Sequence, residues 1–75
     1  MGKLRVLSGA EACRILEENG FIAVRQRGSH QVMQRRTGSV TVTVPVPMHP
    51  ELRIGTLASI VRQSELPRVL FEVGE

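Results

Sequence analysis

Several residue types are scarce or absent in this chain of 75 residues, which has one cysteine, no tryptophan, no tyrosine and no aspartate. The single Cys13 cannot form a disulfide within the chain. No apolar run approaches the roughly 20 residues of a membrane span, and no signal-peptide pattern opens the sequence. We therefore expect a cytoplasmic protein that spans no membrane. The length allows one small domain, which we expect to cover residues 1–75.

Acidic residues are missing from the middle of the chain. Between Asn19 and Pro50 there is no glutamate, and the only charged residues there are Arg25, Arg27, Arg35 and Arg36. Nine of the ten basic residues are arginine, whose guanidinium can bind a phosphate through two parallel hydrogen bonds. This pattern indicates a nucleic-acid partner. The alternative is a basic strand face that serves only solubility.

Aromatic side chains are limited to Phe21 and Phe71. Proteins that bind single-stranded nucleic acid commonly stack bases on aromatic rings, and this sequence offers no such platform. We therefore expect binding to be dominated by phosphate contacts and by shape.

The first structural signal is a helix start. Ser8 and Glu11 have the spacing of a capping box, in which each side chain accepts a hydrogen bond from the backbone amide of the other residue. Apolar residues then recur at helical spacing, and Asn19-Gly20 is typical of a helix end with a left-handed glycine. We predict a helix over residues 9–19. Cys13 lies on its apolar stripe and is interpreted as a core residue, not a nucleophile.

Three strand-like segments follow the helix. Residues 21–26 are apolar and partly β-branched, residues 30–36 return after a turn at Gly28, and residues 40–44 alternate valine with threonine. A second turn contains Gly38. Strands joined by such short turns pair as an antiparallel meander.

A proline-rich segment and a second helix complete the pattern. We predict that residues 45–50 form a rigid extended linker outside the sheet, because proline lacks the amide donor of a strand ladder. An apolar stripe at helical spacing predicts a helix over residues 57–65 with Thr56 as its N-cap. For the apolar tail at residues 68–75, three alternatives stay open: it packs on the sheet, extends it or contacts a partner.

The predicted element order is α-β-β-β-α, which defines a small α+β domain. A three-stranded antiparallel sheet needs one face covered, so we expect both helices on the valine face of the third strand. The other face stays exposed.

A glycine, a serine and a histidine stand where the second strand begins. Gly28 permits a sharp turn, and the histidine side chain is the usual proton carrier near neutral pH. Ser29 is placed to orient the imidazole of His30 or to touch a phosphate. Strand alternation groups His30 with Val32, but a bulge at Gly28-Ser29 would shift that register, so the sequence leaves the face of His30 open. The alternative reading is a surface histidine on a strand.

The second imidazole belongs to His49, in the proline-framed segment before the second helix. We interpret it mainly as a residue that fixes this loop, with direct catalysis as the alternative. Two histidines far apart in sequence, one helical cysteine and no aspartate do not form a recognisable ligand set. We therefore predict no metal site and no cofactor.

Five segments together carry a family resemblance: Cys13–Phe21, Arg25–His30, Val42–Pro45, His49 and Gly55–Ile60. They resemble the HicA toxin family over nearly the whole chain through Gln63. The Arg-x-x-Gly-Ser-His signature and the later Pro, His, Gly-Thr-Leu series are the most specific parts. The sequence departs from the family pattern in the Pro-Val-Pro-Met run before His49 and at Ser64–Pro67, where Ala-Gly-Leu is more common.

The resemblance implies a small toxin of a type II toxin-antitoxin pair, with a fold like that of double-stranded-RNA-binding domains. Members of the family cleave messenger RNA without needing the ribosome. Their essential histidine matches His30, and a HicB-type antitoxin protein is implied that masks the active surface.

On this reading, catalysis needs no metal. His30 is the catalytic general acid or base and takes the proton of a ribose 2′-hydroxyl that attacks the adjacent phosphate. Supporting residues are Gly28, Ser29 and His49, and the predicted RNA-binding residues are Lys3, Arg25, Arg27, Arg35 and Arg36. The group that protonates the leaving oxygen stays open among Arg27, Lys3, His49 and His30 itself. The alternatives are a non-catalytic RNA-binding module and a toxin-like domain that acts only as an interaction partner.

Overall fold

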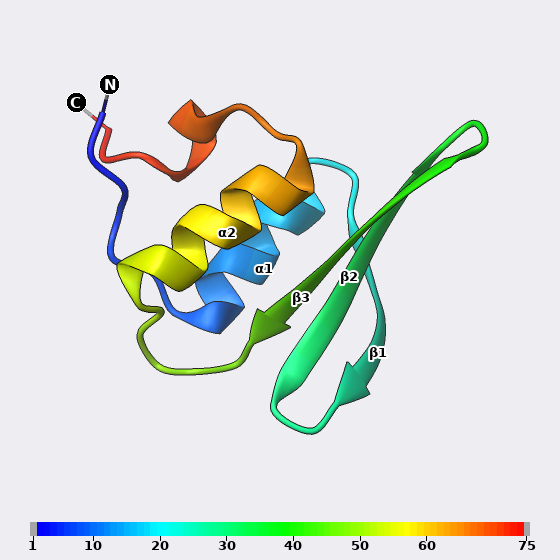
Figure 1. Cartoon of the computed structure of the whole chain (residues 1–75), viewed down its shortest axis with the longest axis horizontal. Coiled ribbons are helices and arrows are strands. Elements are labelled where there is room, and N and C mark those ends of the chain that lie inside the picture. Colours follow the sequence, from blue (N-terminus) through cyan, green and yellow to red (C-terminus); the bar gives the residue numbers. More distant parts are fainter. Residues whose placement is uncertain (1, 75) are drawn as a thin grey trace.

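Two helices and one three-stranded sheet make up the computed structural model, which describes residues 2–74 (Figure 1). The elements in chain order are α1 (Gly9–Glu18), β1 (Ile22–Arg27), β2 (His30–Thr37), β3 (Val40–Pro47), α2 (Ile54–Ser64) and the short 3-10 helix η1 (Arg68–Phe71). Both strand pairs are antiparallel, and the spatial order is β1-β2-β3. The predicted order and the α+β class are confirmed.

Helix α1 begins with the predicted capping box. The backbone amide of Glu11 donates to Ser8 Oγ at 3.0 Å, and the amide of Ser8 donates to Glu11 Oε1 at 2.8 Å. The bond from the Ser8 backbone, more than that from its side chain, holds the pKa of Glu11 below its usual value. Cys13 is buried, and burial raises the pKa of its thiol, as expected of a core residue.

The core lies between the helices and one face of the sheet. Met33 and Val44 point inward from β2 and β3, and Leu16, Leu57 and Ile60 meet them from α1 and α2. Figure 1 shows the two helices side by side on the same side of the sheet. Each fully buried aliphatic side chain of this kind contributes about 1.5–3 kcal/mol. The prediction that both helices cover the valine face is confirmed.

Strand β3 is longer than the sequence indicated. The prediction of a linker over residues 45–50 was wrong for its first part, because Pro45 pairs with Val32 and Pro47 pairs with His30. The amide of Met48 donates to the Ser29 carbonyl at 2.7 Å. Along an edge strand, successive backbone amides point alternately toward the neighbouring strand and away from the sheet. Because the amide of Met48 points toward the β1–β2 hairpin, the nitrogens of Pro45 and Pro47 point away from the sheet. A missing donor there removes no bond from the ladder.

Helix α2 begins three residues earlier than predicted. Its N-cap is Arg53, which makes no side-chain capping bond, and not Thr56. Ile54 is 65% exposed, so the first turn carries no apolar stripe that periodicity could detect. At the other end, the buried hydroxyl of Ser64 donates to the Val61 carbonyl at 2.7 Å and accepts the amide of Leu66 at 3.1 Å.

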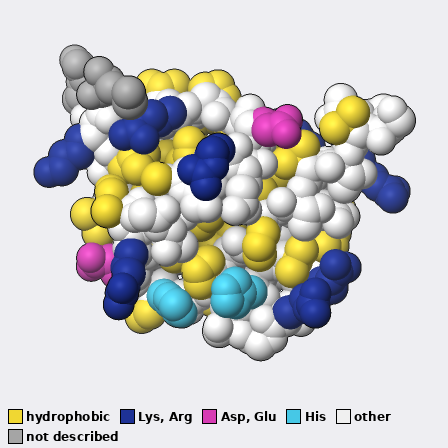
Figure 2. Space-filling view, viewed as in Figure 1, with side chains coloured by type: hydrophobic (Ala, Val, Ile, Leu, Met, Phe, Trp, Pro, Cys, Tyr) yellow, Lys and Arg dark blue, Asp and Glu magenta, His cyan; other side chains and the backbone are white. Residues whose placement is uncertain are grey.

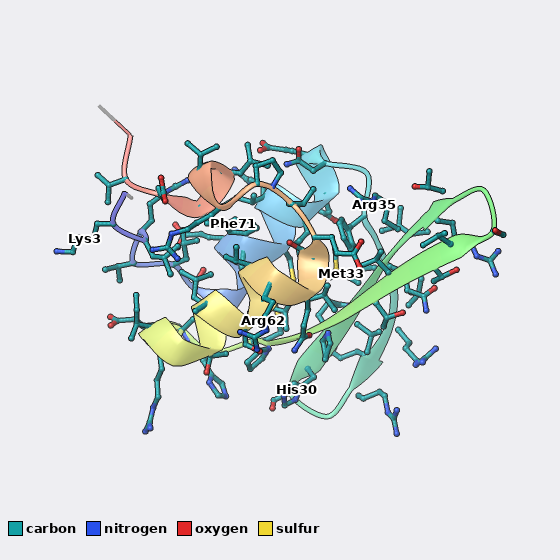
Figure 3. The ribbon with its side chains drawn as sticks, turned by 45° about the horizontal axis from the view of Figure 1, so that its top comes forward. Lys3, His30, Met33, Arg35, Arg62 and Phe71 are labelled. Carbon is teal, nitrogen blue, oxygen red and sulfur yellow. The ribbon has the colours of Figure 1, made fainter. Side chains whose placement is uncertain are left out.

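The tail packs against the helices instead of extending the sheet. Phe71 in η1 is fully buried and contributes to the same core as Met33 (Figure 3). An antiparallel bridge joins Leu4 to Glu72, and the amide of Val73 donates to the Lys3 carbonyl at 2.8 Å. The two ends of the described chain therefore hold each other. No helix within residues 2–74 is long and apolar enough to cross a membrane.

Replacing Glu65 with glycine should stabilise the fold. Glu65 caps α2 in the left-handed conformation, with φ of 61°, and it places a negative charge at a helix C-terminus. Relief of both effects should raise the free energy of unfolding by about 1 kcal/mol. Urea unfolding of Glu65→Gly beside the parent protein measures the change. An unchanged or lower midpoint would contradict this account of the cap.

Candidate functional site

A two-residue turn places Arg27 opposite His30. Gly28 has a φ of +58° and Ser29 has a negative φ, so only the first turn residue needs the conformation that glycine favours. The pair Arg27–His30 closes the hairpin between β1 and β2. Gly28-Ser29 is therefore a simple turn, and the bulge considered there from the sequence is not present.

The bulge lies instead at Val24, in the middle of β1. Ala23 pairs with Met33 and Arg25 pairs with Val32, so one extra residue stands in β1 between these pairs. The carbonyl of Arg25, beside the bulge, accepts a hydrogen bond from Gln31 Nε2 at 2.9 Å. An extra residue reverses the alternation of faces along a strand. Ala23 consequently faces the helices while Arg25 and Arg27 face away from them.

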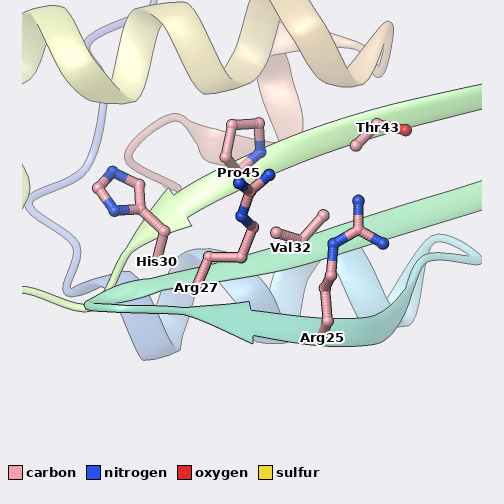
Figure 4. Close-up of a pocket in the computed structure, with 6 residues that line it drawn as sticks. All are labelled: Arg25, Arg27, His30, Val32, Thr43 and Pro45. Atoms are coloured by element: carbon pink, nitrogen blue, oxygen red, sulfur yellow. The ribbon is translucent and has the colours of Figure 1, made fainter.

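The face of the sheet turned away from the helices contains a hollow of about 350 Å³. All three strands contribute to its lining, which consists of Arg25, Arg27, His30, Val32, Thr43 and Pro45 (Figure 4). The strand register stacks Arg25, Val32 and Pro45 in one row. The next row contains Arg27, His30 and Pro47. Adjacent side chains in such a row are about 5 Å apart at Cβ, so His30 stands directly beside Arg27.

The hollow is cationic and has no carboxylate in its lining. Among residues 2–74, neither Arg25 nor Arg27 makes an ion pair, and the only salt bridge joins Arg68 to Glu72 at the distant tail. Figure 2 shows both histidine side chains at the surface of one face, with basic side chains to either side. This arrangement can attract an anion and offers an exposed imidazole next to a guanidinium.

The structure separates the other predicted basic residues from this hollow. Arg35 lies on the helix side of the sheet, with its Cζ 5.1 Å from the centroid of the Phe21 ring. Arg36 shares the face of His30 but lies six residues further along β2, about 20 Å away. Lys3 belongs to the N-terminal segment and lies well apart from His30 (Figure 3).

His49 is held near the hairpin by backbone contacts. Its carbonyl accepts the amide of Gly9 at 2.9 Å, and the preceding residue, Met48, donates to Ser29, the neighbour of His30. A Cβ on Gly9 would collide with the Pro47 carbonyl oxygen and lie 2.8 Å from Met48 Cα. The start of α1 can therefore approach the end of β3 only because residue 9 has no side chain.

Three lining residues were not predicted from the sequence as part of a site. Val32 is only 5% exposed although it lies on the face away from the helices. Thr43 and Pro45 come from β3, and extending its alternation by one residue through Pro45 would have placed them both on the outer face. Within the described part of the chain, no group of three or more histidine, cysteine or acidic residues could hold a metal ion.

A comparison with protein families gives a match over most of the chain. The model of the family described as "HicA toxin of bacterial toxin-antitoxin" matches residues 9–66. This stretch contains α1, the whole sheet and α2, and it includes every lining residue of the hollow and both histidines. The match confirms the resemblance seen in the sequence. Among curated proteins, no match was found.

Two glycine substitutions at helix starts should have opposite effects on the free energy of unfolding. Gly9→Ala should lower the free energy of unfolding by about 1–3 kcal/mol, because the new Cβ meets backbone atoms that must shift. Gly55→Ala is the matched control: nothing lies within 4 Å of its added Cβ, and alanine should raise stability by about 0.5–1 kcal/mol.

Thermal unfolding measures the change in stability of each variant. The NMR signals of the His49 ring report whether its loop has moved. The His49 signals should move in Gly9→Ala and stay in place in Gly55→Ala. Equal stability of the two variants would show that the contact between α1 and the end of β3 is not tight.

Proposed function

The chain belongs to the HicA toxin family of bacterial toxin-antitoxin systems, and from this premise we propose that it is a ribosome-independent messenger-RNA endoribonuclease of a type II pair. It acts in the cytoplasm, with His30 as general acid or base. The observation that carries the proposal is the position of His30, exposed at the start of the central strand and directly beside Arg27. An imidazole and a guanidinium side by side suit a phosphodiester, which needs both proton transfer and charge stabilisation.

The proposed step is an internal transfer of the phosphate. The ribose 2′-hydroxyl loses its proton to His30 as its oxygen forms a bond to phosphorus. The bond from phosphorus to the 5′-oxygen of the next nucleotide breaks, and that oxygen takes up a proton. The products are a 2′,3′-cyclic phosphate and a free 5′-hydroxyl. Arg27 stabilises the extra negative charge on the phosphate oxygens.

The positions of the candidate residues support some of them more than others as the group that protonates the leaving oxygen. Lys3 loses support because it lies well apart from His30 (Figure 3). Arg27 loses support because arginine does not release its proton in proteins. His49 gains support from the backbone bond between Met48 and Ser29, which holds its loop against the hairpin. We propose His49 as this acid, with return of the proton by His30 as the alternative.

The proposed mechanism uses only the RNA and the chain's own side chains. The nucleophile is the substrate's hydroxyl, and arginines provide the positive charge. We further propose that a HicB-type antitoxin with an acidic surface covers the hollow, because complementary charge favours association and occupation of the hollow blocks His30.

A second function is favoured by one specific observation. The imidazole of His30 makes no side-chain hydrogen bond within residues 2–74, whereas general bases are commonly oriented by a partner. A non-catalytic RNA-binding module would need only the cationic hollow. Cleavage assays on purified protein separate the two functions.

Substituting the two histidines one at a time tests the catalytic assignment. Loss of a general acid or base typically lowers the rate about 10²- to 10⁴-fold, and we expect such a loss in His30→Ala. His49→Ala should lose a similar factor if it is the leaving-group acid, and much less if it only fixes its loop. The rate of cleavage of a purified RNA, measured in EDTA, gives both values.

Two controls accompany this comparison. Both variants must keep the parent's circular dichroism and melting transition, and an RNA with 2′-deoxyribose at the cleaved position should resist cutting. Full activity in folded His30→Ala would show that the assignment is wrong. Binding without any cleavage by the parent protein would support the RNA-binding module.

Arginines on the two faces of the sheet should differ in their effect on RNA affinity. If Arg27 neutralises a phosphate, Arg27→Ala should flatten the log-log salt dependence of binding by about one unit or less. Arg35→Ala serves as the comparison, because this residue packs on Phe21 on the helix side and should leave the slope unchanged. Filter binding over a range of salt concentrations measures both slopes. Equal flattening would place the RNA elsewhere than on the hollow.

A further inference from the structure

The floor of the hollow is apolar, although its rim is charged. Val32 and Pro45 are neighbours in one row of the sheet, and both line the hollow. A phosphate gains nothing from such a floor, because apolar groups give an anion no hydrogen bond. A flat, uncharged ring does gain from it, since burial of its faces removes apolar area from water. The floor therefore suits an uncharged ring of a ligand and not its phosphate.

The size of the hollow suits one small ring system. Its volume of about 350 Å³ is near the lower end of the range found for small-molecule sites, about 300–1,000 Å³. His30 is one of the residues that line the hollow. A nucleotide whose phosphate reaches His30 thus has room for its base, or for the base of its neighbour, in the same hollow.

Apart from His30, the polar groups around the floor offer hydrogen-bond donors. Arg25 and Arg27 can only donate. The hydroxyl of Thr43 accepts a bond from Gln34 Nε2 at 3.2 Å, which leaves its own hydrogen free to donate. A ring seated here is therefore bound best if the edge that it presents carries acceptors.

We propose that the hollow is a base-binding subsite that selects guanine in single-stranded RNA, an inference that rests on the proposed function. Guanine presents two neighbouring acceptors, N7 and O6, on one edge. On the same edge adenine has an amino group beside N7 and cytosine has an amino group at the corresponding place, so each base that presents this edge sets a donor against the donors of the rim. On this edge uracil presents one acceptor, O4, and ranks second.

The strand register assigns different tasks to the two arginines. Arg27 pairs with His30 and is the one placed to hold the phosphate, whereas Arg25 pairs with Val32, beside the floor. A guanidinium fork can bond to N7 and O6 of guanine together, which a lysine ammonium cannot do with the same geometry. Arg25 is therefore the specificity-determining residue of the subsite.

Binding of uncleavable RNA tests the proposal. The probes are fluorescein-labelled 2′-O-methyl uridine octamers in which one central residue is uracil, guanine, adenine or cytosine. We expect the guanine probe to bind the parent protein about tenfold more tightly than the adenine or cytosine probe at one fixed salt concentration. A probe with 7-deazaguanine, which lacks the N7 acceptor, should lose most of that advantage. Equal affinity for all four bases, or a preference for adenine or cytosine, would overturn the proposal.

Matched lysine variants identify the residue that reads the base. Arg25→Lys keeps the charge but removes the fork, so the affinity for the adenine and cytosine probes should change little while the guanine preference falls to about twofold or less. Arg36→Lys is the control on the same face, outside the hollow, and should keep the full preference. A guanine preference that survives in Arg25→Lys would overturn the role given to this residue.

The readout separates this inference from the proposed function. The 2′-O-methyl probes are not cut whichever residue is catalytic, so base selection is measured without cleavage. Ribonuclease activity combined with equal binding of all four bases would leave the function intact and remove the subsite. Guanine selection by a protein that never cuts RNA would keep the subsite and remove the catalytic function.

Discussion

One-sided burial of the sheet is the constraint on which the rest of the structure depends. The helices cover only one face, so alternation along each strand decides whether a side chain meets the core or water. Met33 and Val44 are fixed on the inner side, and their neighbours must then face outward. His30 and Thr43 lie on the outer face for this reason. The proposed site is thus defined by the same register that builds the core.

Local signals in the sequence predicted most of the fold. The Ser8–Glu11 capping box, the glycine turns and the valine alternation each act within a few residues, and each appears in the structure as expected. The errors occurred where tertiary context decides the outcome. Pro45 and Pro47 belong to a strand because their nitrogens face an unpaired edge, and no local pattern shows that β3 is an edge strand.

The sequence identified the two residues at the centre of the candidate site, but not all the residues that line it. His30 and Arg27 were recognised because the turn that joins them is local. Arg35 was grouped with the other arginines by sequence proximity, but it stacks on Phe21 on the inner side of the sheet. The bulge at Val24 reverses the faces along β1, and no single residue there signals it. The hollow needs side chains from three strands, so it emerges only when their register is known.

The position of Phe71 in the chain has a consequence for biosynthesis. The β1–β2 hairpin depends on contacts close in sequence, and hairpins of this kind form in about 1–10 μs. The core is completed only by Phe71, which follows every other core residue in the order of synthesis. A growing chain that lacks this ring has the hairpin but not the packing that holds it in place. The hairpin therefore gains its full packing only after Phe71 has been synthesised.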